Sequence, residues 1–526
     1  MKQTPHDHTG RPAERRPAPV GNALPGARIG PATTSRRDLL AAGAALLAAP
    51  FVLHSGRAAA AERPALPIPP LDNGHIEGGV RVFDLEVRRG THGFFPGIGT
   101  RTIGINADYL GPMLRMKRGE TVRFNVTNRI GENMTLHWHG FELPAWCDGG
   151  PHQVIAPNAT WRPEFEVLQR AGSYWAHGHQ LHKTAEHVWA GMAVLMRVEE
   201  EDGPELPSEY GVDDLPVALQ ERRFTASGQM PYNPSMPDVM MGMAGDVPLV
   251  NGAISPRAEV PAGLVRLRIW NASNASVYRL AFDDGRPFAM VASDGGLLEE
   301  PVTMRSLVLA SAERAEIVVD LSDGAPVRLV ADTIPIAVGM MGGMGRGMMG
   351  GMMGGPMGES ARRFDFLELV PRGRGRATAL PSRLASLPPA TRDMARSVRP
   401  FELQMRMGPA MMMGRGFAIN GRSMDPRVID ERVPAATAEI WRITNASPMM
   451  HPFHIHDTQF RILSRGGRPP AAHERGFKDT VLVMPGEPVE VLVTFPDYRD
   501  PELPYMYHCH ILEHEDAGMM GQFVTV

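Results

Sequence analysis

The chain has 526 residues, which is too long for one ordinary hydrophobic core and favours two or three domains. Its formal net charge of −4 excludes a bulk electrostatic attraction to nucleic acid. Aromatic residues make up only 6%, whereas the 56 glycines and 48 prolines are typical of short strands joined by many turns.

Residues 1–61 have the pattern of a targeting segment rather than of a folded domain. An arginine-rich leader reaches a twin-arginine pattern at 35–40, an apolar stretch at 41–53 comes next, and small residues at 58–61 offer a cleavage site. The apolar stretch is too short to span a bilayer permanently. We therefore expect the twin-arginine machinery to export the folded protein to a bacterial periplasm.

After the leader, strand-like runs separated by Gly, Pro and Asn predict an all-β fold. The chain also contains an internal repeat, because the segments 250–252 and 268–273 are echoed by 419–421 and 442–447. A fainter version of the second segment occurs at 123–128. The same structural unit is therefore expected more than once.

The copies of this repeat differ in the residues that come directly after them. Histidine clusters come after the first and third copies, whereas the middle copy continues with Val277-Tyr278-Arg279-Leu280. The middle unit is thus expected to carry no metal ligands and to act as a spacer between the other two. We predict Greek-key β-sandwich domains at about 62–200, 210–370 and 399–526, with a linker rich in Arg, Ala and Pro at 371–398.

Histidine pairs with one residue between them predict a metal site. Nineteen histidines placed at random would give only about 0.7 such pairs, a rough false-positive estimate. A pair in the leader, His6 and His8, shows what a chance pair looks like. Four further pairs lie in β-like contexts, and each could aim two imidazoles at one point: His137 and His139, His177 and His179, His454 and His456, His508 and His510.

The end of the chain adds a second kind of site. Cys509, His514 and Met519 recur at spacings of five residues, a thiolate, imidazole and thioether set that suits a blue copper centre. His451 can supply the second imidazole. On an extended strand the neighbours of a residue point to the opposite face, so His508 and His510 are expected to face another site together.

The 34 methionines are clustered. Residues 339–358 contain eight Met and ten Gly, which leaves no periodic face to bury and a high cost in chain entropy. Two further clusters lie at 405–413 and 230–243. Neutral thioethers bind Cu(I) far better than hard cations, so we interpret the longest cluster as a Cu(I)-recruiting segment.

These residues identify a family resemblance that covers nearly all of the chain after the leader. The chain resembles the multicopper oxidases, and within them the bacterial periplasmic copper-efflux (cuprous) oxidases. The resemblance is strongest at 137–140, at 451–456, at 469–473 leading to 478–481, and in the C-terminal segment. It implies three cupredoxin-like domains, and an oxidoreductase that uses O2 as acceptor.

The resemblance also implies four copper ions per chain, with every ligand position filled, which excludes the family members that lost copper and became structural proteins. The type 1 copper is expected at His451, Cys509, His514 and Met519. The type 2 copper is expected at His137 and His454. The two type 3 coppers are expected at His139, His177, His179, His456, His508 and His510. Because Cys509 is a ligand, Cys147 is expected to be a buried free thiol.

Three residues take catalytic roles from the same resemblance. Cys509 links the type 1 copper to His508 and His510, while Asp148 and Glu515 align with carboxylates that supply protons near the other coppers. The family's substrate-copper site uses acidic residues, but Ser447 stands where an Asp would precede Met449 by two residues. The candidate ligands of substrate Cu(I) are therefore thioethers: Met340, Met341, Met344, Met348, Met349, Met352, Met353, Met405, Met407, Met411, Met412, Met413 and Met449.

Three functions remain open from the sequence. The leading hypothesis is a monomeric oxidase that couples one-electron oxidation of Cu(I) to reduction of O2 to water, in periplasmic copper tolerance. The second is a laccase-like oxidase of phenols or other organic or metal substrates, which Met-rich covering segments would hinder. The third is a copper-sequestering protein, against which the complete ligand set argues because sequestration needs no three-copper cluster.

Overall fold

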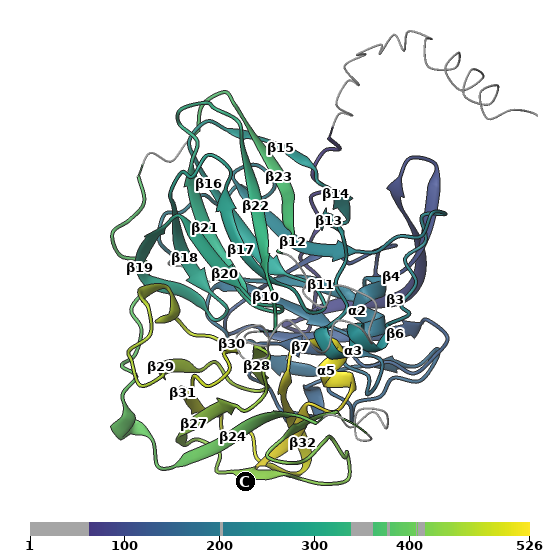
Figure 1. Ribbon diagram of the computed structural model, residues 1–526, viewed down its shortest axis with the longest axis vertical. Coiled ribbons are helices and arrows are strands. Elements are labelled where there is room, and N and C mark those ends of the chain that lie inside the picture. The colour runs from purple at the N-terminus through teal and green to yellow at the C-terminus, as the bar shows by residue number, and fades with distance from the viewer. Residues whose placement is uncertain (1–62, 200–202, 338–360, 376–378, 407, 409–415) are drawn as a thin grey trace, which may run out of the picture. The chain divides into compact units, whose positions relative to one another are not determined.

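The computed structural model describes residues 63–199, 203–337, 361–375, 379–406, 408 and 416–526 (Figure 1). These residues form six β-sheets with only short helices, which confirms the all-β prediction. Each sheet draws its strands from one stretch of chain, so the sheets fall in three consecutive pairs. No helix in the described part of the chain is long and apolar enough to cross a membrane.

The first pair of sheets uses residues 71–199. One sheet has the order β1-β5-β11-β10-β7, with β1 (Leu71–Asp72), β5 (Met113–Lys117), β11 (Ala193–Glu199), β10 (Gly172–His177) and β7 (His137–His139). The other has the order β2-β3-β6-β8, with β2 (His75–Glu77), β3 (Val80–Phe95), β6 (Thr121–Arg129) and β8 (Thr160–Trp161). The strands β4 (Ile98–Ile105) and β9 (Glu164–Glu166) pair with β3 and β6. Alternate residues of β6 are buried, as expected for a strand with one face on a core.

The second pair uses residues 214–372. Its larger sheet has the order β14-β13-β12-β16-β21-β18-β19, with β14 (Ala253–Ile254), β13 (Val247–Val250), β12 (Asp214–Arg222), β16 (Leu264–Asn271), β21 (Arg314–Asp320), β18 (Phe288–Ser293) and β19 (Gly296–Met304). Its smaller sheet has the order β15-β23-β22-β17-β20, with β15 (Arg257–Pro261), β23 (Arg363–Arg372), β22 (Val327–Ile334), β17 (Val277–Phe282) and β20 (Ser306–Leu309).

The third pair uses residues 398–525. One sheet has the order β25-β24-β27-β31-β29, with β25 (Phe417–Ile419), β24 (Val398–Met405), β27 (Ala438–Asn445), β31 (Val489–Thr494) and β29 (Arg461–Arg465). The other has the order β26-β33-β32-β28-β30, with β26 (Glu431–Val433), β33 (Met520–Thr525), β32 (Asp500–Cys509), β28 (His451–Ile455) and β30 (Thr480–Val483). The helices are α2 (Thr184–Ala190), α3 (Met236–Met241) and α5 (Leu512–Asp516), with 3-10 turns η1 (Ala145–Cys147), η2 (Arg392–Met394) and η3 (Ala472–Glu474).

The domain boundaries expected from the sequence stay a prediction, because residues 63–526 form a single compact unit. The grouping of strands nevertheless follows the expected order, and β23 extends to Arg372, two residues into the expected linker. We call the three stretches 71–199, 214–372 and 398–525 the first, middle and third units.

A buried asparagine turn occurs once in each unit, at Asn128, Asn271 and Asn445. In each case Nδ2 donates to a carbonyl four or five residues later and to a second carbonyl on a facing segment, at 2.6 to 3.1 Å. The side-chain oxygen accepts the N–H two residues later, at 3.0 to 3.2 Å. This shared geometry confirms the internal repeat and fixes the chain direction just before β28 in the third unit.

Candidate metal centre

The histidine pairs lie on strands that pair with one another. In the first unit β7 and β10 are antiparallel, which places His137 opposite His177. In the third unit β28 and β32 are antiparallel, which places His454 opposite His508. The register of the paired strands therefore brings two histidine pairs together in the first unit and two in the third unit.

The eight histidines, all at most 1% exposed, then meet across the two units. Three groups have ring nitrogens within 4.8 Å of one another. The groups are His137, His454 and His456; His139, His177 and His510; and His179, His456 and His508. Every group combines residues of the first and third units.

In three of the four pairs the two imidazoles belong to different groups. His137 and His139, for example, belong to different groups. Alternate residues of a strand share a face but lie about 7 Å apart, so they reach neighbouring points rather than a single one. Each of these three histidine pairs thus contributes one imidazole to each of two neighbouring groups.

Most of these imidazoles are held at one ring nitrogen by a neighbouring oxygen. His137 donates from Nδ1 to the Asp148 carbonyl at 2.8 Å, and His454 donates from Nδ1 to the Asp479 carbonyl at 2.8 Å. His456 donates from Nδ1 to Asp148 Oδ2 at 2.9 Å. His139 differs, since it is held at Nε2, which donates to Asp479 Oδ1 at 3.0 Å.

The opposite ring nitrogen is the one that faces the groups. Within the described residues, His137 Nε2, His139 Nδ1, His177 Nε2, His454 Nε2 and both nitrogens of His510 are buried without a hydrogen-bond partner. A buried polar atom without a partner costs about 1–3 kcal/mol. Imidazoles anchored at one nitrogen and free at the other are the usual arrangement of metal-ligating histidines, so these residues fit a metal cluster.

Protonation favours the same interpretation. Burial lowers the pKa of His177 to about 3 and that of His179 to about 4, and it holds the pKa of His137, His139 and His454 well below the usual value. Neutral imidazole is the form that binds metal. At neutral pH the cluster is therefore ready to accept cations without first losing protons.

A second group forms around Cys509. Its Sγ lies 3.4 Å from His451 Nδ1 and 3.7 Å from His514 Nδ1, and the two imidazole nitrogens are 3.3 Å apart. Met519 is fully buried in the same hydrophobic core as Cys509, and its carbonyl accepts the Cys509 N–H at 3.0 Å. Two imidazoles, a thiol and a nearby thioether are the donor set of a blue copper centre.

Residues 508–510 divide between the two sites, as the alternation along a strand predicts. Cys509 joins His451 and His514, whereas His508 and His510 belong to two different groups of the histidine cluster. Burial raises the pKa of the Cys509 thiol, so a thiolate there requires a bound cation. Cys147 is a buried free thiol, as expected.

The two expected carboxylates both contact the histidine cluster. Burial raises the pKa of Asp148 well above its usual value, and besides its bond to His456 its Oδ1 lies 3.5 Å from His137 Nδ1. Glu515 lies 3.1 Å from His508 Nδ1 and 3.4 Å from His179 Nδ1. Burial opposes ionisation of Glu515, but these two imidazoles lower its pKa to about 2.

The sequence missed three residues that hold the ligands. Ser447 accepts a hydrogen bond from His451 Nε2 at 2.7 Å and donates to Asn445 Oδ1 at 2.8 Å. Asp479 anchors His139 and His454, and its place in the motif 478–481 was the only signal for it. Arg314, from the middle unit, hydrogen-bonds Asp479 and had no sequence signal.

The remaining histidines singled out by the sequence do not join these groups, and only two of the candidate methionines lie in the described residues. His152, His182, His187 and His473, which were expected to have no ligand role, stay outside them. Met449 is buried and Met405 is half-buried, and both belong to the core of the third unit. The remaining candidates, in 338–360 and at Met407 and Met411–Met413, lie outside the described residues.

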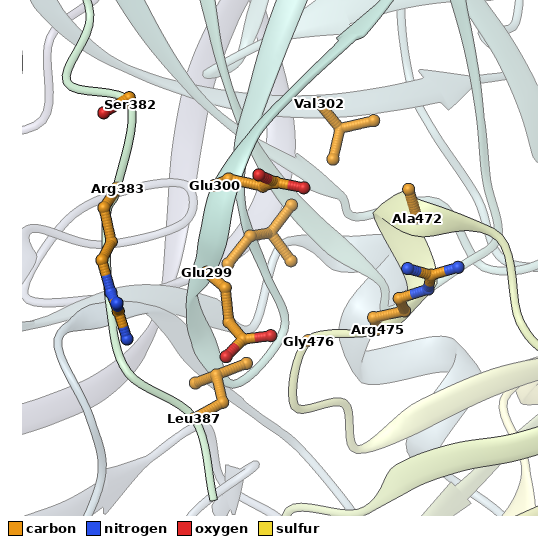
Figure 2. Close-up of a pocket in the computed structure, with 10 residues that line it drawn as sticks. Glu299, Glu300, Val302, Ser382, Arg383, Leu387, Ala472, Arg475 and Gly476 are labelled. Atoms are coloured by element: carbon orange, nitrogen blue, oxygen red, sulfur yellow. The ribbon is translucent and has the colours of Figure 1, made fainter. Parts of the chain in front are cut away.

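A surface pocket of about 400 Å³ lies away from the metal ligands (Figure 2). Figure 2 shows Glu299 and Glu300 on β19, Arg383 on a separate segment, and Arg475 on the turn after η3. None of its ten lining residues is a histidine, cysteine or methionine, so its chemistry does not suit copper.

Comparison with known proteins agrees with this geometry. Residues 86–203 and 396–526 each match a family model described as multicopper oxidase. The chain is 33% identical to the multicopper oxidase mco of Staphylococcus aureus over 86% of this chain and 90% of that protein. It is 34% identical to the cell division protein FtsP of Escherichia coli strain K12, over 93% and 98% of the two chains.

A solved structure is also similar over most of the chain. It is a laccase-like multicopper oxidase, CueO, from the lignin-degrading bacterium Ochrobactrum sp.. The TM-score is 0.77 and the sequence identity is 38%, over 88% of this chain and 100% of that chain.

Asp148→Asn tests the carboxylate beside the histidine cluster. The amide oxygen can still accept from His456, but the side chain no longer carries an acidic proton. We expect O2 consumption by the copper-loaded protein to fall about 100-fold, the lower end of what a positioned proton donor contributes. The blue absorption of the Cys509 group should be retained. Asp393→Asn, at the surface, is the control, and unchanged turnover in Asp148→Asn would contradict the role.

Ser447→Ala tests the hydroxyl that orients His451. It removes the acceptor of the Nε2 hydrogen bond, so we expect copper at the Cys509 group to bind about tenfold more weakly and its reduction potential to shift. Ser273→Ala removes the equivalent hydroxyl from the middle unit's asparagine turn, where no histidine comes next, and should cost only about 1 kcal/mol of stability. Redox titration, visible absorption and thermal unfolding of both variants separate the two effects. Equal spectra and potentials would show that Ser447 serves the turn alone.

Proposed function

The chain belongs to the multicopper oxidase family, oxidoreductases that use O2 and a reducing substrate, and we propose that its reducing substrate is Cu(I). The reaction couples one-electron oxidation of Cu(I) to the four-electron reduction of O2 to water. The leader at 1–61, which lies outside the described residues, directs export to the periplasm in this proposal. There a monomeric enzyme would lower the concentration of toxic Cu(I).

The proposed cofactor is four copper ions in the two sites described above. His451, Cys509, His514 and Met519 would hold the type 1 ion. His137 and His454 would hold the type 2 ion, with His139, His177 and His510 on one type 3 ion and His179, His456 and His508 on the other. When bound, these ions supply the one-electron redox chemistry that couples substrate oxidation to O2 reduction.

The protein's own residues prepare both sites. Burial of all eight imidazoles keeps bulk water out of the histidine cluster, and the oxygen partners keep the free nitrogens aimed inward. Asp148, beside His456, would supply a carboxyl proton for water formation, because burial raises its pKa. Glu515, beside His508, is ionised and would accept protons and pass them on. The main chain of 508–510 is a short covalent connection between the two sites.

The observation that carries the choice of Cu(I) is the convergence of methionine-bearing segments on His514. Its Nε2 donates to the carbonyl of Met240, in α3, at 3.0 Å. Met240 and Met241 pack against the same core that contains Met449 and Met519. The thioethers that these segments carry would favour a soft monovalent cation as electron donor.

The two other methionine-rich sequences begin at the same place. Ala337, immediately before the segment 338–360, forms a β-bridge with Met449. Met405, immediately before the cluster that continues to Met413, pairs with Phe417, whose ring stacks on His514 at a centroid distance of 4.0 Å. Both sequences therefore leave the described structure within the surroundings of the type 1 site. Ser447, hydrogen-bonded to His451, supplies no charge there, so the proposed Cu(I) site relies on sulfur.

A laccase-like activity is the second candidate, and the relative from Ochrobactrum favours it by its description. Against it, the outer nitrogen of His514 is covered by α3. That helix is fixed by a capping box between Ser235 and Asp238 and by an ion pair from Arg223 to Asp238 at 2.6 Å. A phenol would have to displace this helix to reach His514.

Two functions without catalysis fit less well. Copper sequestration would not require eight imidazoles arranged in three groups behind the thiol site. The similarity to FtsP raises a role in cell division, but the complete set of copper ligands favours the oxidase. Both alternatives predict negligible O2 turnover.

The direct test is O2 uptake by the copper-loaded protein, with weakly chelated Cu(I) in one cell and a simple phenol in the other. We expect fast uptake with Cu(I) and slow uptake with the phenol, because thioethers recruit Cu(I) and α3 covers His514. Fast uptake with the phenol alone would make the protein a laccase. No uptake with either would favour a binding or structural role.

Deletion of 339–358 tests the methionine-rich sequence. We expect Cu(I) oxidation to fall severalfold, while phenol oxidation stays the same or rises, since the removed thioethers recruit only Cu(I). Replacement of the eight methionines by leucine is the matched control, because it keeps the length and removes the sulfur. Equal loss of both activities in the deletion, with full Cu(I) oxidation in the leucine variant, would assign the segment a folding role.

A further inference from the structure

Within its described residues, the middle unit supplies no member of the histidine groups or of the Cys509 group, yet one of its side chains contacts the carboxylate that holds His139. Arg314, on β21, is 1% exposed. Its guanidinium donates from Nη1 to Asp479 Oδ1 at 2.7 Å and from Nη2 to Asp479 Oδ2 at 2.5 Å. This is the bidentate geometry in which arginine fixes a carboxylate most firmly.

Asp479 in turn holds a histidine from each of the other units. Its Oδ1 accepts from His139 Nε2 at 3.0 Å, and its main-chain carbonyl accepts from His454 Nδ1 at 2.8 Å. His139 is left with Nδ1 free toward His177 and His510, the reverse of the usual choice of nitrogen in this cluster. The carboxylate thus decides which nitrogen of His139 is available to a metal.

The guanidinium of Arg314 is itself fully hydrogen-bonded. Besides its two bonds to Asp479, Nε donates to the Ser173 carbonyl at 3.1 Å, Nη1 to the Ala312 carbonyl at 3.2 Å, and Nη2 to the Asp294 carbonyl at 2.9 Å. All five N–H donors of the guanidinium therefore have acceptors. These acceptors come from the first unit (Ser173), from the loops beside β21 and from the third unit (Asp479).

The main chain next to the Arg314–Asp479 contact leaves no room for a side chain. Gly140, the residue after His139, has a φ of +86°, and a Cβ there would overlap Asp479 Oδ2 and come within 3.1 Å of Arg314 Nη2. Gln459 donates from Nε2 to the Gly140 carbonyl at 2.8 Å and to Asp479 Oδ2 at 2.9 Å. The glycine of the segment 137–140 is thus explained by the close approach of this carboxylate and arginine.

A neighbouring contact fixes the same strand. Lys478 lies 2.8 Å from Asp294 Oδ2 and 3.1 Å from Glu313 Oε1, both in the middle unit. Glu313 directly precedes Arg314, so adjacent residues of the middle unit contact Lys478 and Asp479 in turn. The middle unit determines the position of the start of β30 by buried ionic contacts at two successive residues.

We propose that Arg314 is a positioning residue for the histidine cluster, which acts by fixing the Asp479 carboxylate so that His139 presents Nδ1 to the metal it shares with His177 and His510. The middle unit is then part of the metal centre and not merely a spacer. This inference rests on the copper cluster of the proposed function, but not on Cu(I) as the substrate.

The test uses Arg314→Lys in the full-length, copper-loaded protein. Lysine keeps the charge but cannot form the fork to both carboxylate oxygens. We expect the histidine cluster to lose copper to a competing chelator at a roughly 10- to 100-fold lower chelator concentration, the usual effect of losing such a contact. Blue absorption from the Cys509 group should be unchanged. Copper per chain by elemental analysis and visible absorption are the two readouts.

Arg268→Lys is the matched control. Arg268 is also buried, forms a bidentate pair with Asp214 at 2.7 and 2.9 Å, and contacts Ser173. Its carboxylate partner differs from Asp479, because among the described residues the side chain of Asp214 bonds only to arginines. The Arg268 substitution should lower the melting temperature of the copper-free protein without changing copper retention. If Arg314→Lys behaves in the same way, with copper retained as in the unchanged protein, the proposal is overturned.

A second variant tests whether Arg314 acts through Asp479. Asp479→Asn removes the carboxylate, so the double variant Arg314→Lys/Asp479→Asn should lose no more copper than Asp479→Asn alone. Additive losses would show that the arginine acts by another route. Because no reducing substrate is present, these results do not depend on the test of Cu(I) oxidation, and either proposal can fail without the other.

Discussion

Burial of many neutral imidazoles in one place is the constraint on which the rest of this structure depends. Eight histidines are almost completely excluded from water, and several ring nitrogens in the described residues have no partner. Each such nitrogen costs about 1–3 kcal/mol unless a cation occupies the space between them. The fold therefore holds the opposite nitrogens with carbonyls and carboxylates, and it leaves the free ones facing one another in a geometry that a metal cluster would stabilise.

The three copies of the repeated unit share the asparagine turn and differ in the side chains beside it. The asparagine turn has the same hydrogen bonds in all three units. In the third unit a serine of that turn also reaches His451, whereas in the middle unit the corresponding serine has only main-chain and asparagine partners. The middle unit contacts the histidine cluster through Arg314 instead. The same repeated unit thus supplies candidate metal ligands in the first and third units, and residues that hold those ligands in the middle and third units.

The thiol site is enclosed by its surroundings, since His514 is fully buried. His514 has one nitrogen beside Cys509 and the other hydrogen-bonded to the carbonyl of Met240. The surroundings of the thiol site therefore include α3, and the strands next to Met405 and Met449 lie close by.

The sequence by itself determined the all-β class, the internal repeat and the candidate histidine pairs, because strand alternation and close histidine spacing are local patterns. It also placed Asp148 and Glu515 near the metal through a family resemblance. Only the tertiary structure decided how the four histidine pairs divide among three groups, since that depends on the register between β7 and β10 and between β28 and β32. Arg314 and Asp479 are 165 residues apart, and their contact exists only because buried charges from different units must pair when water is excluded.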